Sequence, residues 1–140
     1  MLKILSDLKK ELKSRFKDDF TGLVLFGSYA RNTQTKNSDL DILLIFDKLP
    51  PGRLERIRLV SGIIDPIEKK YKIDINPIIK LGKELKKTPL LMDIAEYAKI
   101  LHDTNNSIKP VFDSIRKDYA NGQIVKERCE DSYVLKVNNA

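Results

Sequence analysis

Residues 23–47 read LVLFGSYARNTQTKNSDLDILLIFD, and this stretch decides the fold. It begins and ends with apolar runs, Leu23–Phe26 and Ile42–Phe46, whose length and composition are typical of buried strands. The segment between them is mostly polar and rich in Asn, Thr, Gln and Lys. The stretch therefore predicts two core strands joined by a connection that starts with Gly-Ser and ends in an acidic pair.

The acidic pair consists of Asp39 and Asp41, which open the second apolar run. Residues two apart on a strand point to the same face, so we expect the two carboxylates side by side and Leu40 turned into the core. Like charges this close repel each other. A divalent cation removes that cost, and Mg²⁺ is usually held by one or two carboxylates together with water and phosphate oxygens. The pair therefore indicates a magnesium site.

Gly27 and Ser28 follow the first strand and suit the phosphate side of such a site. Glycine lets the backbone approach an anion closely, and serine offers a hydroxyl and an N–H, with a short helix expected to start here. Ser28 is also an ordinary helix N-cap, and that structural role is compatible with phosphate contact.

A third strand is predicted over residues 72–79, where apolar and polar residues alternate. Ile73 and Ile75 are expected on one face and Asp74 and Asn76 on the other. Pro77 lacks an N–H, which predicts that this strand lies at a sheet edge or is bulged there.

Two short runs, GSYAR at Gly27–Arg31 and SDLDI at Ser38–Ile42, carry a family resemblance. Gly-Ser followed after ten residues by Asp-x-Asp resembles the signature of the DNA polymerase beta-like nucleotidyltransferase superfamily. The fuller form resembles its small prokaryotic branch, the minimal nucleotidyltransferases. The resemblance spans about residues 23–103 and implies an α/β (α+β) fold, a small mixed sheet of four to five strands with helices packed on it.

The resemblance also implies roles for the motif residues. Gly27 and Ser28 would contact the triphosphate of ATP or another NTP, and Asp39, Asp41 and Asp74 would bind two Mg²⁺ ions. Three converging carboxylates with two ions form a clamp for in-line phosphoryl transfer.

Two further residues are candidates for nucleotide binding. Arg31 either reaches a phosphate or pairs with a nearby acid. Ser38 is expected to hydrogen-bond neighbouring backbone and so to position the acids that follow it. His102, the single histidine, is interpreted as a polar residue at the end of a strand.

The composition agrees with one soluble domain of 140 residues, with 41% hydrophobic and 33% charged residues. No apolar run approaches the roughly 20 residues that cross a bilayer, and the single cysteine fits a reducing compartment, so a cytoplasmic location is expected. The net charge is +6, with many cations in residues 53–87. These cations form either a phosphate-attracting surface or solvated helix faces. No motif indicates a nucleic-acid partner.

The remaining elements are predicted from spacing and breakers. We expect helices over residues 2–17, 53–71, 89–97 and 107–119, a strand over 99–103, and a helical extension over 104–140 whose apolar end closes the core or docks a partner. Pro66 predicts a kink or break near Asp65.

The function implied by the resemblance is transfer of a nucleoside monophosphate, AMP from ATP, to an acceptor. Small domains of this branch often act as antitoxins with a HEPN-type partner, some by adenylylating a tyrosine of that toxin. Two alternatives stay open, a non-catalytic antitoxin that neutralises its partner by contact and a nucleotidyltransferase acting on a small molecule such as an aminoglycoside. Homo- and hetero-oligomers are both compatible with the sequence.

Overall fold

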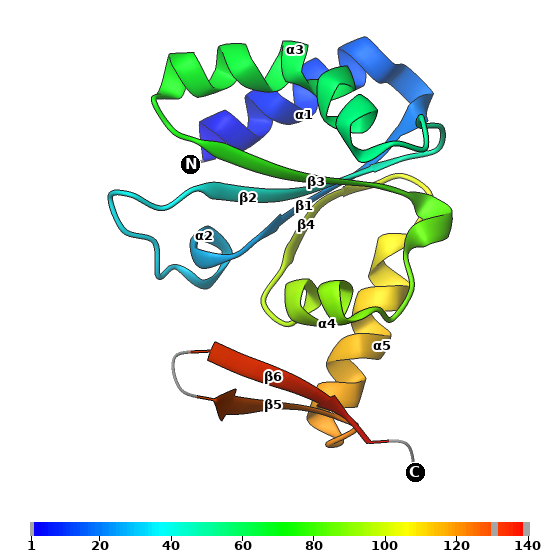
Figure 1. Ribbon diagram of the computed structural model, residues 1–140. Coiled ribbons are helices and arrows are strands. Elements are labelled where there is room, and N and C mark those ends of the chain that lie inside the picture. The colour runs from blue at the N-terminus through cyan, green and yellow to red at the C-terminus, as the bar shows by residue number, and fades with distance from the viewer. Residues whose placement is uncertain (1, 130–131, 139–140) are drawn as a thin grey trace.

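The computed structural model describes residues 2–129 and 132–138, and its main feature is a four-stranded sheet in the order β3-β2-β1-β4 (Figure 1). The strands are β1 (Phe20–Phe26), β2 (Leu40–Phe46), β3 (Ile75–Leu81) and β4 (Lys99–Asp103). β2 and β4 run antiparallel to β1, whereas β3 runs parallel to β2. This mixed sheet with helices packed on it confirms the predicted fold class.

Helices cover both faces of the sheet, with α1 and α3 on one face and α4 and α5 on the other (Figure 1). The helices are α1 (Leu2–Phe16), α2 (Ser28–Arg31), α3 (Arg53–Tyr71), α4 (Pro89–Ala95) and α5 (Ile108–Ala120), with 3₁₀ turns at Lys17–Asp19 and Gly82–Glu84. From Ile42 onward β2 is apolar because it is buried on both faces: Ile42 and Leu44 pack on the α1/α3 side, whereas Leu43 and Ile45 pack on the α4/α5 side. None of the helices in the described ranges is both long and apolar enough to span a bilayer.

Helix α3 contains Pro66 in its interior. The helix runs without interruption through this residue, so of the kink or break predicted near Asp65, the break is absent. Proline costs a helix about 3 kcal/mol, since it removes one hydrogen bond. The flanking Ile63, Ile64 and Ile67 are buried in the core, and burial of such side chains contributes about 1.5–3 kcal/mol each. Tertiary packing therefore outweighs the local cost.

Strand β3 begins at Ile75, three residues later than predicted. Helix α3 persists to Tyr71, and Lys72 ends it with a left-handed φ of 53°. Asp74 therefore precedes the strand instead of lying within it. β3 is an edge strand, as predicted from the missing N–H of Pro77.

The C-terminal segment is not all helical. After α5, strands β5 (Ile124–Cys129) and β6 (Ser132–Val137) form a separate antiparallel hairpin. The helical extension predicted for residues 104–140 is therefore wrong beyond α5. Ile124 is buried in the α4/α5 core, whereas Val125, Val134 and Val137 are exposed, so the two predicted roles of the apolar end both stay open. Lys126 Nζ lies 2.7 Å from the Glu96 carboxylate, so the hairpin is also tied to the end of α4 by charge.

Candidate active site

The predicted acids lie where β2 and β3 begin. Asp41 is opposite Asn76 in the parallel register, and the N–H of Leu40 donates to the carbonyl of Asp74 over 2.8 Å. One step earlier in this register, Asp39 is opposite Asp74. Residues opposite each other in neighbouring strands share a face of the sheet.

The face on which Asp74 lies follows from its neighbours. Ile73 and Ile75 both pack in the core on the α1/α3 side, and alternation then directs Asp74 to the opposite side of the sheet. Asp41 is also on that opposite side, because Leu43, two residues further along β2, packs against α4 and α5. The structure therefore brings Asp39, Asp41 and Asp74 to one end of the sheet, where β2 and β3 begin, and strand alternation predicts that they share a face.

The three acids are not drawn into a closed cluster. Asp39 and Asp74 are exposed and Asp41 is half-buried. Within residues 2–129 and 132–138, no three carboxylate, imidazole or thiol side chains converge closely enough to form a ready-made metal site. An open row of carboxylates suits hard cations that also bind substrate phosphates and water, because the protein then supplies only part of the coordination shell.

Asp41 is the best-positioned of the three acids. Its Oδ1 accepts a hydrogen bond from the amide of Asn76 at 3.1 Å. Its other carboxylate oxygen, Oδ2, lies 2.1 Å from the point that a Cβ on Gly27 would occupy. Gly27 has φ 73° and ψ −156°, a conformation that is essentially restricted to glycine. The glycine at this position therefore leaves the Asp41 carboxylate a space that no other residue would leave.

The Gly27-Ser28 turn leads directly into α2, which lies near the end of the sheet where β2 begins (Figure 1). The carbonyl of Gly27 accepts hydrogen bonds from the N–H groups of Ala30 and Arg31 at 3.1 and 3.2 Å. The first N–H groups of a helix have no acceptor within it. The turn thus places Gly27 and the start of α2 beside Asp41, and contact of Gly27 and Ser28 with phosphate stays a prediction.

Arg31 stacks on an aromatic ring. Its guanidinium carbon lies 4.7 Å from the centroid of the Tyr97 ring. Among the described residues it forms no ion pair, so the predicted pairing with an acid is not found. Sequence reasoning missed Tyr97, which lies in the turn between α4 and β4, because only the fold brings that turn beside α2.

Ser38 closes the loop that leads to the acids. Its Oγ accepts a hydrogen bond from the N–H of Thr35 at 2.8 Å, and its own N–H donates to the Thr35 carbonyl at 3.2 Å. These bonds match the expected structural role of Ser38, immediately before Asp39. Contact of Ser38 with a nucleotide stays a prediction.

His102 lies away from the acids, on the face of the sheet that α1 and α3 cover. It pairs with Leu23 across β1 and β4, and its ring stacks on Phe20 at a centroid distance of 5.0 Å. Burial lowers the pKa of His102, and the nearby cations Lys9 and Lys13 lower it further. This position agrees with the interpretation of His102 as a structural strand residue.

Comparison with known proteins adds family information to this geometry. A family model described as a nucleotidyltransferase domain matches residues 5–109. A Methanocaldococcus jannaschii protein, provisionally named protein adenylyltransferase MJ1305, is 34% identical over 116 residues, which cover 81% of this chain and 79% of that protein. A second protein from the same organism with a name of the same kind, MJ0141, is 31% identical over 97 residues, 69% of this chain and 94% of its own.

Solved structures show the same fold. A provisionally assigned nucleotidyltransferase from Sulfolobus solfataricus superposes with a TM-score of 0.55 at 22% identity, covering 74% of this chain and 80% of that one. A chain from a toxin–antitoxin crystal structure with AMP-PNP gives a TM-score of 0.55 at 19% identity, covering 83% and 87%. A chain from the toxin–antitoxin complex MntA-HepT gives 0.54 at 16% identity, covering 88% and 90%.

Proposed function

Because the chain belongs to the nucleotidyltransferase domain family, we propose that it transfers AMP from ATP to a hydroxyl group of an acceptor. The acceptor oxygen forms a bond to the α-phosphorus, the bond from that phosphorus to the bridging oxygen breaks, and pyrophosphate leaves with the electron pair. The observation that carries the proposal is the side-by-side placement of the Gly27-Ser28 turn and the Asp41 carboxylate.

The donor set fits divalent cations. Asp39, Asp41 and Asp74 offer only hard carboxylate oxygens at one end of the sheet, and Gly27 leaves the Asp41 carboxylate open. These residues would hold two Mg²⁺ ions. When bound, Mg²⁺ neutralises phosphate charge and lowers the pKa of an attacking hydroxyl.

The protein's own groups bind the phosphates and accept the proton of the acceptor. The N–H groups and hydroxyl of the Gly27-Ser28 turn hold the β- and γ-phosphates. Asp74 lies at the edge of the row and receives the proton of the acceptor hydroxyl. Arg31, held against Tyr97, adds a positive charge to the phosphate side. Alignment and charge neutralisation account for most of such a barrier reduction, so loss of one acid should cost several kcal/mol.

The acceptor we propose is a tyrosine of a HEPN-type toxin, which makes this chain an antitoxin. The relatives at 34% and 31% identity carry protein adenylyltransferase names, which supports a protein acceptor. Chains of this fold also occur in toxin–antitoxin complexes, one of them described as an MNT antitoxin with a tri-AMPylated HEPN toxin. These names describe the relatives, and their extension to this chain is the proposal.

One experiment tests catalysis and neutralisation together. The purified protein is incubated with ATP labelled on the α-phosphate, Mg²⁺ and a HEPN-type toxin, next to the variant D39N/D41N. The matched control is D47N/D65N, which removes two exposed carboxylates that lie outside the acid row, our name for Asp39, Asp41 and Asp74. We expect label on a toxin tyrosine with the wild type and the control, and none with D39N/D41N.

Two results would contradict the proposal. Equal labelling by D39N/D41N would exclude the acid row as the catalytic group. Full neutralisation of the toxin by D39N/D41N without labelling would assign the chain to antitoxins that act by contact.

A further inference from the structure

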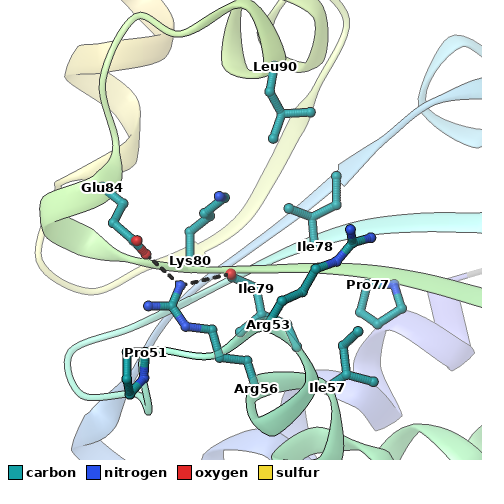
Figure 2. Close-up of a pocket in the computed structure, with 10 residues that line it drawn as sticks. All are labelled: Pro51, Arg53, Arg56, Ile57, Pro77, Ile78, Ile79, Lys80, Glu84 and Leu90. Atoms are coloured by element: carbon teal, nitrogen blue, oxygen red, sulfur yellow. Dashed lines mark hydrogen bonds and ion pairs between the residues drawn. The ribbon is translucent and has the colours of Figure 1, made fainter.

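A pocket of about 440 Å³ lies along the outer edge of β3, between α3 and α4 (Figure 2). It contains none of the predicted site residues. It begins at Pro77, one residue after Asn76, whose amide contacts the Asp41 carboxylate. Strand β3 therefore connects the pocket to the acids through Asn76, and the pocket extends along this strand to Lys80.

The free edge of β3 is closed to an added strand. The N–H of Ile75 donates to the Glu68 carboxylate at 2.7 Å, and the N–H of Leu81 donates to Glu84 Oε1 at 2.7 Å. Between them Pro77 has no N–H to offer. Because edge strands blocked in this way resist strand addition, an occupant of the pocket must be recognised through its side chains.

The pocket walls are apolar and accessible. Ile57 from α3 and Leu90 from α4 lie on opposite sides of β3 and are 37% and 41% exposed. Ile78 and the Pro77 ring form the wall between them (Figure 2). Large apolar side chains gathered around one hollow favour an apolar ligand group.

The charges of the pocket are unbalanced. Arg56 is buried and pairs with Glu84 at 2.7 Å, so these two charges compensate each other. Burial opposes ionisation of Glu84, but the N–H of Leu81 and the Arg56 guanidinium outweigh burial and lower the pKa of this carboxyl. Arg53 and Lys80 also line the pocket, and neither forms an ion pair among the described residues.

Three cations of the basic segment 53–87 are paired: Arg56 with Glu84, Lys70 with Asp7, and Lys87 with Asp118. The other cations of the segment form no ion pair among the described residues, and of these Arg53 and Lys80 are the two that line the pocket. The pocket thus joins apolar walls to two cations that are available to a ligand.

We propose that this pocket binds an acidic, apolar-flanked segment of the acceptor protein and so holds the acceptor beside the acid row. This inference rests on the proposed function, since it assigns a docking surface for that reaction's protein substrate. A carboxylate of the segment meets Arg53 and Lys80, and its apolar neighbours fill the space between Ile57 and Leu90. Four residue steps along β3 lead from Asn76 to Lys80, about 13 Å of strand, so a few residues of extended acceptor chain connect the pocket to the acids. Nucleic acid fits less well, because a phosphate chain has no apolar side chains for these walls.

The test measures binding without ATP. The probe is a fluorescein-labelled peptide in which Glu and Asp alternate with Leu and Phe, and fluorescence anisotropy gives its Kd. The pocket variant is R53E/K80E. The matched control, R58E/K69E, makes the same change of net charge at exposed cations of α3 that do not line the pocket.

We expect R53E/K80E to weaken peptide binding about tenfold or more, and R58E/K69E to change it by less than about twofold. Leu90→Gln, at an exposed position, should weaken binding with both cations intact, and it keeps the test decisive if R53E/K80E fails to fold. Equal weakening by both charge variants would overturn the proposal. The proposal would also be overturned if the wild type did not bind the peptide. A third contrary result would be that a single-stranded RNA oligonucleotide displaces the peptide fully while Leu90→Gln has no effect on peptide binding.

The outcome separates this inference from the proposed reaction. If R53E/K80E transferred AMP to a toxin as well as the wild type does, the docking role of the pocket would be rejected and the proposed reaction would remain. Peptide binding that depends on the pocket, in a protein that transfers no AMP, would reject the reaction and leave the docking surface standing.

Discussion

Substitution of Gly27 by alanine should remove activity while most of the fold persists. The new Cβ would lie 2.1 Å from Asp41 Oδ2 and 3.0 Å from the carboxylate carbon, whereas ordinary contacts begin at 3.4 Å. The carboxylate must therefore retreat by roughly 1 Å or more, and a misplacement of that size costs about 100-fold in rate. The backbone conformation of Gly27 adds about 1–3 kcal/mol of strain for any residue with a side chain.

Alanine substitutions at two other glycines distinguish the steric effect on Asp41 from the effect of backbone strain. Gly122 has φ 81° but no atom within 4 Å of an added Cβ, so Gly122→Ala reports backbone strain alone. Gly82 has neither a positive φ nor a close neighbour, so Gly82→Ala reports the substitution itself. The assay is the initial rate of AMP transfer from labelled ATP, with the free energy of unfolding measured in urea on the same samples. Wild-type transfer by Gly27→Ala would refute the assigned contact between this turn and Asp41.

Three further predictions concern other parts of the chain. Arg56→Met should lower the free energy of unfolding, measured by urea titration, by about 1–3 kcal/mol, because it leaves the partly buried Glu84 carboxylate without its ion-pair partner. An unchanged urea midpoint would contradict a stabilising role of this ion pair. His102 has a lowered pKa, so the unfolded chain binds more protons than the folded chain near and below pH 6.5, and the free energy of unfolding should rise with pH through that window. His102→Asn should flatten this pH dependence. A pH profile identical to that of the wild type would refute the assignment of the dependence to His102. Tyr97→Ala should raise the KM for ATP about two- to fivefold with kcat nearly unchanged, because Arg31 loses a cation–π contact of about 0.5–1 kcal/mol; an effect on kcat alone would exclude the positioning role.

Local patterns predicted the centre of the fold well. The two apolar runs lie in β1 and β2, and Ile73 and Ile75 pack on the same side of the sheet as predicted, because a strand has a period of two. Pro77 correctly predicted an edge strand, since its missing N–H excludes a central position.

Features that depend on tertiary contacts could not be predicted from the sequence. The passage of α3 through Pro66 is decided by burial of the isoleucines around it, which a local breaker rule does not weigh. The tight approach of Gly27 to Asp41 joins the turn after β1 to β2, and the stacking of Arg31 on Tyr97 joins residues 66 positions apart. The β5–β6 hairpin was missed because its short strands alternate only weakly and are stabilised by contacts with distant elements, such as the burial of Ile124 and the pairing of Lys126 with Glu96.

Binding of Mn²⁺ in the presence of a non-hydrolysable ATP analogue tests the central claim most directly. Electron paramagnetic resonance counts the bound ions for the wild type and for Asp74→Asn, with Asp65→Asn as the control at an exposed acid elsewhere. We predict two bound ions for the wild type and the control, and one for Asp74→Asn, because Asp74 completes the site of only one ion. The same ion count and affinity in all three proteins would contradict a shared metal site built from the acids of β2 and the residue that precedes β3.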